Sequence, residues 1–170
     1  MTSANRKHDQ VMKILVIGDT GVGKTQFVNK FARDQFEHDV KPTVGVEYVT
    51  KTIVVKGHVV CLHIWDLAGR DMFRSITNAY YSGAVGALIV YDITKIRTFD
   101  NTTYWFENLA SRMSEYIDCP VTMLVGNKVD LRHQRSVPSE AAIRVAKQRG
   151  ASFVETSALT GSDVTKALHR

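Results

Sequence analysis

A glycine-rich stretch near the N-terminus constrains the fold of this chain more than any other feature. Residues 18–25 have the sequence GDTGVGKT, which is a glycine, four further residues and then Gly-Lys-Thr. A short apolar run precedes this stretch at residues 13–17, and Phe27, Val28 and Phe31 follow it at helical spacing. This order predicts a buried strand, a phosphate-binding loop and a helix.

The residue types in this loop suit a bound phosphate group. Glycines let the backbone curl until several N–H groups point inward, and the following helix presents its positive end there. We expect Lys24 to reach the β- and γ-phosphates of a nucleotide and the Thr25 hydroxyl to coordinate Mg²⁺. The alternative is a glycine turn that joins a strand to a helix and binds nothing.

Strands and helices alternate along the chain. Strands are predicted near residues 11–17, 44–55, 59–66, 84–91, 121–126 and 151–155, and helices after the glycine-rich loop, before 81, near 98–116, from 138 to 150 and from 162. A glycine-containing turn, Lys56-Gly57-His58, predicts a hairpin between the second and third strands. We therefore expect an α/β fold with a six-stranded, mostly parallel sheet, one antiparallel strand and helices on both faces.

Length and composition are those of one globular domain. The 170 residues allow a sizeable core, with residues 1–10 as a flexible polar tail and 11–170 as the domain. The net charge of +5 is spread along the chain, which favours a solvated surface over a nucleic-acid or membrane patch. The two cysteines lack metal-ligand or redox spacing, and the chain has no secretory signal, so we expect a cytoplasmic protein.

The other candidate motifs also follow predicted strands. Asp66 ends the third strand, where a carboxylate can hold Mg²⁺, usually through a water molecule. Asn127-Lys128-Val129-Asp130 follows the fifth strand, and residues 156–159 follow the sixth. Because ligands of parallel sheets bind at the carboxyl ends of the strands, these motifs should gather at one edge of the sheet.

The Asp130 carboxylate predicts which base such a site accepts. Guanine offers a carboxylate two donors, N1–H and the exocyclic amino group, whereas adenine has an acceptor at N1 and no such amino group. Adenine would therefore leave a buried carboxylate unpaired, a mismatch that gives strong discrimination. The expected cofactors are GTP or GDP and Mg²⁺.

These motifs, in this order, resemble those of Ras-superfamily small GTPases, most of all the Rab branch. The resemblance runs from about Met12 to the end of the chain and includes VGVEY at 44–48, FRSIT at 73–77 and YYSGAVG at 80–86. It implies a P-loop NTPase fold of the Ras-like G-domain type. The nucleotide-binding residues it implies are Asp19, Thr20, Gly21, Val22, Gly23, Lys24, Thr25, Gln26, Phe36, Thr43, Gly69, Asn127, Lys128, Asp130, Ser157, Ala158 and Leu159.

The resemblance also implies individual roles. Phe36 would pack on the guanine edge, Thr43 would coordinate Mg²⁺ when a γ-phosphate is present, and the Gly69 N–H would contact that phosphate. The implied metal ligands are Thr25, Thr43 and Asp66, and the implied catalytic residues are Lys24, Thr43, Gly69 and Arg70. Loops near residues 39–48 and 68–80 would change with the nucleotide, which makes the protein a two-state switch.

Partner proteins are implied in the same way. Effectors, exchange factors, activating proteins and GDI-type regulators would bind a monomer through the two switch loops and an aromatic triad, Tyr48, Trp65 and Tyr80. The alternative is that the three rings only pack within the protein.

Rab proteins normally continue to prenylated cysteines, which these residues lack, so we expect a truncated chain or an unlipidated member. With a prenylated tail, the protein would lie on the cytosolic face of endomembranes.

One residue departs from the family pattern. Arg70 stands where most members have the glutamine that orients the attacking water. Arginine has only donors and cannot accept a hydrogen bond from that water, which predicts slow hydrolysis. An alternative is that Arg70 stabilises transition-state charge. Other hypotheses are a GTP-binding scaffold without useful hydrolysis, which Arg70 favours, and an ATP-using P-loop enzyme, which Asp130 disfavours.

Overall fold

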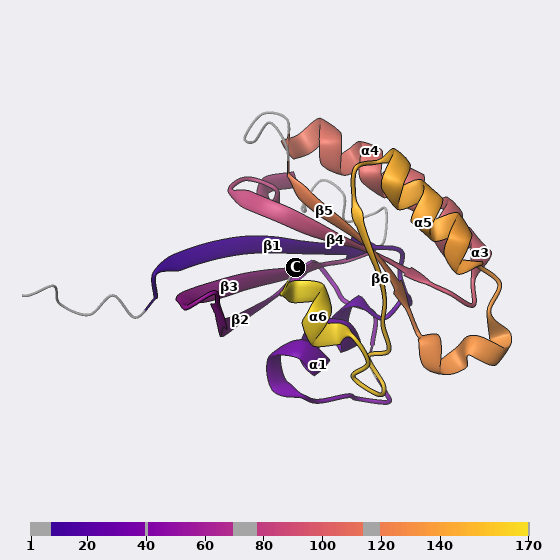
Figure 1. The fold of residues 1–170 in the computed structure, drawn as a ribbon, viewed down its shortest axis with the longest axis horizontal. Coiled ribbons are helices and arrows are strands. Elements are labelled where there is room, and N and C mark those ends of the chain that lie inside the picture. The colour runs from indigo at the N-terminus through magenta and orange to yellow at the C-terminus, as the bar shows by residue number, and fades with distance from the viewer. Residues whose placement is uncertain (1–7, 40, 70–77, 114–119, 170) are drawn as a thin grey trace, which may run out of the picture.

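In the computed structural model, described for residues 8–39, 41–69, 78–113 and 120–169, one sheet organises the chain (Figure 1). Its strand order is β2-β3-β1-β4-β5-β6, and only β2 and β3 pair antiparallel. The strands are β1 (Gln10–Gly18), β2 (Val46–Val55), β3 (His58–Leu67), β4 (Ala84–Asp92), β5 (Val121–Asn127) and β6 (Ser152–Glu155). The predicted α/β class, with six strands and one antiparallel strand, is confirmed.

The predicted hairpin joins β2 to β3 through a two-residue turn. Val55 pairs with His58, and Lys56 and Gly57 both have left-handed backbones, with φ of 49° and 82°. Such turns match the twist of the flanking strands. β2 begins two residues later than predicted, because Gly45 turns the chain with φ of 76° and its carbonyl accepts a 2.9 Å hydrogen bond from Ala68 N.

Helices cover both faces of the sheet (Figure 1). One face carries α1 (Lys24–Arg33) and α6 (Val164–Leu168), and the other carries α3 (Ile96–Asp100), α4 (Thr102–Met113) and α5 (Ser139–Gln148). In its described part, up to Met113, the helix predicted over 98–116 is two helices, α3 and α4, which are separated by Asn101. Two 3₁₀ helices, η2 (Asn78–Tyr80) and η3 (Val129–Gln134), complete the described elements, and η3 was not predicted.

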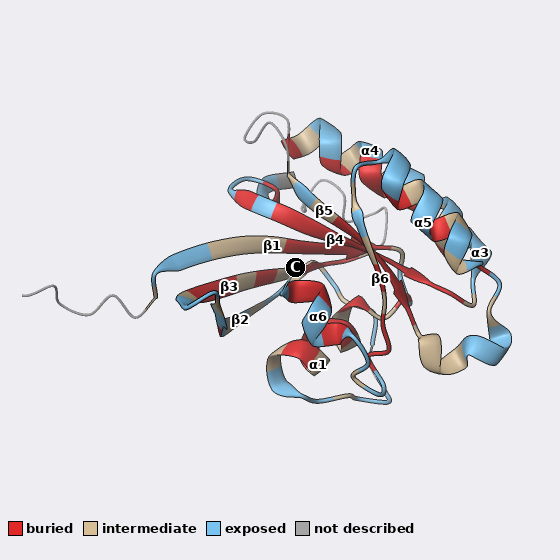
Figure 2. Cartoon of the chain, viewed as in Figure 1, coloured by how far each residue is buried: buried red, intermediate tan, exposed pale blue. Residues whose placement is uncertain are grey.

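The carboxyl-terminal parts of β1, β4 and β5 are buried on both faces, as Figure 2 shows. Val16 and Val90 pack towards α1, whereas Leu15 and Ile89 pack towards α4 and α5. Because β1, β3, β4, β5 and β6 run parallel, their carboxyl ends open at one edge, where the polar residues can meet. Within the described ranges, no helix is long and apolar enough to cross a membrane.

Candidate functional site

A cavity of about 460 Å³ lies at the carboxyl edge of the sheet. It is formed by the glycine-rich loop, residues 36–38 and 41–43, and the turns after β3, β5 and β6. The predicted residues that line it are Thr20, Gly21, Gly23, Lys24, Thr25, Gln26, Phe36, Thr43, Gly69, Asn127, Lys128, Asp130, Ala158 and Leu159. Of the other predicted site residues, Asp19, Val22, Asp66 and Ser157 lie outside this lining, and Arg70 lies outside the described residues. The motifs predicted to converge therefore do so.

Lys24 lies inside the glycine-rich loop. Only 6% of the residue is exposed, and its ammonium donates to the carbonyl oxygens of Gly18, at 2.9 Å, and Asp19, at 2.8 Å. Burial lowers the pKa of Lys24 to about 8, although Asp66 and Asp19 act in the opposite direction. An anion in the cavity would offset that desolvation, so the site is built to accept negative charge.

Two glycines are required by close packing around this loop. A Cβ at Gly69 would lie 2.4 Å from Thr20 N and 2.6 Å from Gly18 O, so the turn after β3 rests on the loop backbone. A Cβ at Gly23 would lie 2.5 Å from the Asn127 side chain, and Gly23 also has φ of 95°. These contacts hold the loop between the ends of β3 and β5.

Three oxygen-bearing side chains meet beside Lys24. The Thr25 and Thr43 hydroxyl oxygens lie 2.8 Å apart, and the Thr25 hydroxyl donates to Asp66 Oδ2. Among the described residues, the buried Asp66 Oδ1 has no hydrogen-bond partner. Burial raises the pKa of Asp66 to about 6, against opposing effects of Lys24 and Thr25. Hard oxygen ligands around an unsatisfied carboxylate oxygen fit Mg²⁺.

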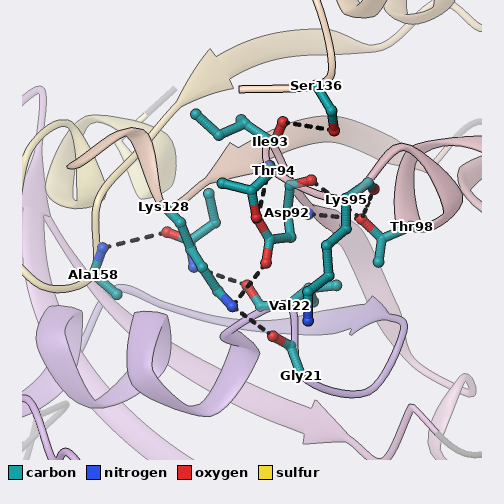
Figure 3. A network of polar contacts seen from close by, with 11 residues as sticks. Gly21, Val22, Asp92, Ile93, Thr94, Lys95, Thr98, Lys128, Ser136 and Ala158 are labelled. Atoms are coloured by element: carbon teal, nitrogen blue, oxygen red, sulfur yellow. Dashed lines mark hydrogen bonds and ion pairs between the residues drawn. The ribbon is translucent and has the colours of Figure 1, made fainter. Parts of the chain in front are cut away.

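The turn after β5 is bonded directly to the glycine-rich loop (Figure 3). Asn127 Nδ2 donates to Val22 O at 3.0 Å, and Lys128 Nζ donates to Gly21 O at 2.8 Å. The Asn127 side-chain oxygen accepts hydrogen bonds from Ala158 N and the Thr156 hydroxyl. Asn127 is 1% exposed, so its side chain links the motifs after β1, β5 and β6 inside the protein.

Asp130 is positioned by the turn after β6. The Ser157 hydroxyl donates to Asp130 Oδ1 at 2.6 Å and accepts a 3.1 Å hydrogen bond from Thr160 N. Asp130 lines the cavity, where its carboxylate can accept hydrogen bonds from a ligand that carries donors. The site can thus hold phosphate, a divalent cation and a base with two adjacent donors.

Residues 36–38 and 41–43 close the opposite side of the cavity. Glu37 N donates to Gln26 Oε1 at 3.0 Å, and the Gln26 amide donates to Glu37 O. Phe36 lines the cavity and meets the His38 ring edge-on, with 5.2 Å between ring centroids. Prediction from the sequence did not include the other lining residues, Glu37, His38, Lys41, Pro42 and Leu131.

Sequence reasoning also missed residues that support the loop from outside. The Asp19 carboxylate accepts hydrogen bonds from Asn101 Nδ2, at 2.6 Å, and Trp105 Nε1, at 2.8 Å. Asp92, at the end of β4, forms a 2.8 Å ion pair with Lys128. The position of Asp92 directly after an apolar strand was the one available indication, since Asp66 was found by the same feature.

The predicted aromatic triad is assembled at the β2–β3 end of the sheet. The ring centroids of Tyr48 and Trp65 lie 4.8 Å apart, and those of Trp65 and Tyr80 5.2 Å apart. Tyr48 is 47% exposed, and its hydroxyl lies 2.9 Å from His63 Nδ1. Arg70 and the sequence FRSIT at 73–77 lie outside the described residues.

Comparison with known proteins agrees with this geometry. A sequence model described as "Ras family" matches residues 13–170. The chain is 48% identical over 164 residues to "Ras-related protein Rab11A" of Lotus japonicus, which covers 96% of this chain and 71% of that protein. It is 49% identical over 160 residues to "Ras-related protein RABA2d" of Arabidopsis thaliana, covering 94% of this chain and 72% of that protein. A third similar protein is "Ras-related protein YPTC6" of Chlamydomonas reinhardtii, which is 46% identical over 163 residues. The match covers 96% of this chain and 74% of that protein.

Proposed function

Because the chain belongs to the Ras family of small GTPases, we propose that it is a Rab-like switch that regulates membrane traffic through nucleotide-dependent binding of effectors. The observation that carries this proposal is the convergence of Lys24, Asp66 and Asp130 on one edge of the sheet. Lys24 suits phosphate, Asp66 suits Mg²⁺ and Asp130 suits guanine. A glycine turn that binds nothing would not need these three chemistries side by side.

The chain's own residues divide the work between two ends of the nucleotide. Lys24 and the loop N–H groups bind the β- and γ-phosphates, and Asp130 accepts from guanine N1–H and the amino group. Bound Mg²⁺ would neutralise charge on the β- and γ-phosphate oxygens, with Thr25, Thr43 and Asp66 to hold it. Thr43 and the Gly69 N–H contact the γ-phosphate, so the loops that carry them relax after hydrolysis.

Nucleotide competition tests this function directly. A fluorescent GDP analogue bound to the protein should be displaced by GDP or GTP and resist a large excess of ADP or ATP. The discrimination should fall in Asp130→Ala, since the carboxylate that pairs with guanine is removed. Displacement by ATP as effective as by GTP would contradict the proposal and favour the ATP-using enzyme.

Hydrolysis is proposed to be slow because of Arg70. The guanidinium cannot accept a hydrogen bond from the attacking water as a glutamine amide oxygen does. Single-turnover hydrolysis of preloaded GTP should therefore be faster in Arg70→Gln than in the wild type. An equal or slower rate in the variant would mean that Arg70 is irrelevant or stabilises transition-state charge.

A GTP-binding scaffold without useful hydrolysis is the second candidate, and Arg70 is the feature that favours it. Tight GTP binding without hydrolysis in either the wild type or Arg70→Gln would support it.

Effectors and regulators are proposed to bind through the switch loops and the rings of Tyr48, Trp65 and Tyr80. The proposed site of action is the cytosolic face of endomembranes, reached through a lipidated tail.

A further inference from the structure

We infer that Asp92 is a positioning residue for nucleotide binding, which holds the Lys128 side chain across the phosphate-binding loop. This inference rests on the proposed binding of guanine nucleotides and goes beyond it, because Asp92 does not line the cavity. It acts through Lys128, which does. The two residues come from the carboxyl ends of adjacent strands, β4 and β5, where Asp92 pairs in register with Asn127.

Hydrogen bonds to residues other than Lys128 fix the position of Asp92 (Figure 3). The residue is 1% exposed, and its backbone N–H donates to the Thr98 hydroxyl at 3.0 Å. Its Oδ1 accepts two hydrogen bonds from Thr94, from the backbone N at 2.9 Å and the hydroxyl at 2.7 Å. The carboxylate therefore has one orientation, with Oδ2 directed at the ammonium of Lys128.

Lys128 connects this carboxylate to the loop. Its Nζ lies 2.8 Å from Asp92 Oδ2 and donates to Gly21 O, also at 2.8 Å. Within the part of the chain that the structure describes, Asp92 Oδ2 has no hydrogen-bond partner besides this ion pair. The Lys128 ammonium is thus paired within the protein, and the side chain ties the turn after β5 to the loop after β1.

The backbone of Lys128 needs such a tie. It has φ of 70° and ψ of 37°, a left-handed conformation that residues with a Cβ rarely adopt. Conformations of this kind persist where the surroundings over-determine them. Asp92 and Gly21 fix the far end of the Lys128 side chain. This contact also holds the same turn's Asn127 and Asp130 in place for the base.

Charge also favours this assignment. Burial alone would raise the pKa of Asp92, but its bonds to Lys128 and Thr94 lower the pKa below its usual value. The carboxylate is therefore ionised at neutral pH and neutralises Lys128. Lys24, which is buried and lines the cavity, is then the cation that would face the phosphates.

The test is the release rate of a bound fluorescent GDP analogue, chased with excess GDP in Mg²⁺. Asp92→Asn keeps the shape of the side chain and removes its charge, so release should become about tenfold faster, the usual effect of losing a charged hydrogen bond. In a Lys128→Met background the same substitution should change release less than twofold, because the ammonium on which Asp92 acts is gone. An equal acceleration in both backgrounds would overturn the inference, since it would show general loosening.

A matched control separates positioning from stability. Glu155→Gln removes another ion pair, in which Glu155, the last residue of β6, lies 2.6 Å from Arg135. Neither Glu155 nor Arg135 lines the cavity. This variant should lower the melting temperature and leave release unchanged. If Asp92→Asn does not fold, Thr94→Val is the test variant, because it removes the hydroxyl that bonds to the Asp92 carboxylate. It should accelerate release two- to threefold. An unchanged release rate in Thr94→Val, or in Asp92→Asn, would overturn the inference. Failure of the wild type to bind the analogue would instead overturn the proposed function.

Discussion

The two sides of the nucleotide cavity are held together in different ways. One side consists of the phosphate-binding loop and the turns after β5 and β6. There Asn127 and Lys128 bond to the loop at 3.0 and 2.8 Å, and Ser157 bonds to Asp130 at 2.6 Å. On the other side, residues 36–39 and 41–43 are mostly exposed, and side-chain hydrogen bonds join them to Gln26 and Thr25. The first side, which we call the assembled side, is held by its own hydrogen bonds. Among the described residues, the second side has fewer such bonds, some of them at the expected metal ligands. From this difference we expect tight nucleotide binding to depend on the first side and the response to nucleotide state to depend on the second.

Breaking the assembled side should have the largest effect. Lys24→Met removes a buried ammonium that would make charge-assisted hydrogen bonds to two phosphates, so the affinity for GDP should fall at least about 100-fold. Titration of a fluorescent GDP analogue measures the change. Lys30→Met is the matched control on the same helix, because Lys30 pairs with the exposed Asp34 away from the cavity. A loss below tenfold in Lys24→Met would mean that the loop N–H groups alone hold the phosphates.

The next effect should come from the carboxylate that joins the two sides. Asp66 has a pKa raised to about 6 by burial, against 3.8 for a free aspartate. The folded, metal-free protein therefore binds more protons than the unfolded chain between about pH 4 and 6, so its stability falls as the pH rises through that window. Above it, the buried charge costs on the order of 2–3 kcal/mol.

Asp66→Asn removes that charge and should sharpen the comparison. Without metal and nucleotide at pH 7.5, the variant should unfold at higher urea concentration than the wild type, and the pH slope between 4 and 6 should flatten. With GDP and Mg²⁺, the order should reverse, because the wild type alone gains a strong metal ligand. Equal unfolding midpoints with and without Mg²⁺ in the wild type would contradict the assignment of Asp66.

The sequence predicted the assembled side well because its causes are local. GDTGVGKT contains the glycines, the cation and the hydroxyl of the loop, and the parallel strands bring the other motifs to the same edge. The supporting residues could not be found in this way. Asn101 and Trp105 bond to Asp19 across 82 and 86 residues, and both depend on the register of β1 with β4 and on the helix break at Asn101. Local periodicity predicted one uninterrupted helix there, so neither residue was assigned a role.

The weakly held side should respond to Thr43 in a state-dependent manner. Thr43→Val removes the hydroxyl that lies 2.8 Å from Thr25 Oγ1 and keeps the shape of the side chain. Affinity for a non-hydrolysable GTP analogue with Mg²⁺ should fall about tenfold, and affinity for GDP less than twofold. Thr50→Val, at an exposed position of β2, is the control and should change neither value. Equal losses for both nucleotides would contradict a role limited to the GTP state.

The smallest expected effect comes from the chain's two tryptophans, which form a natural pair. Trp105 Nε1 donates to Asp19 Oδ1 at 2.8 Å, whereas Trp65 Nε1 has no hydrogen-bond partner among the described residues. Trp105→Phe keeps an aromatic ring and removes one bond that supports the loop, so GDP release should become about three- to fivefold faster. Trp65→Phe should leave release unchanged and make Trp105 the sole indole, whose fluorescence should then change on GDP binding. Equal release rates in the two variants would mean that the assembled side does not need Asp19 to be held from outside the cavity, and that its bonds to Asn127 and Lys128 are enough.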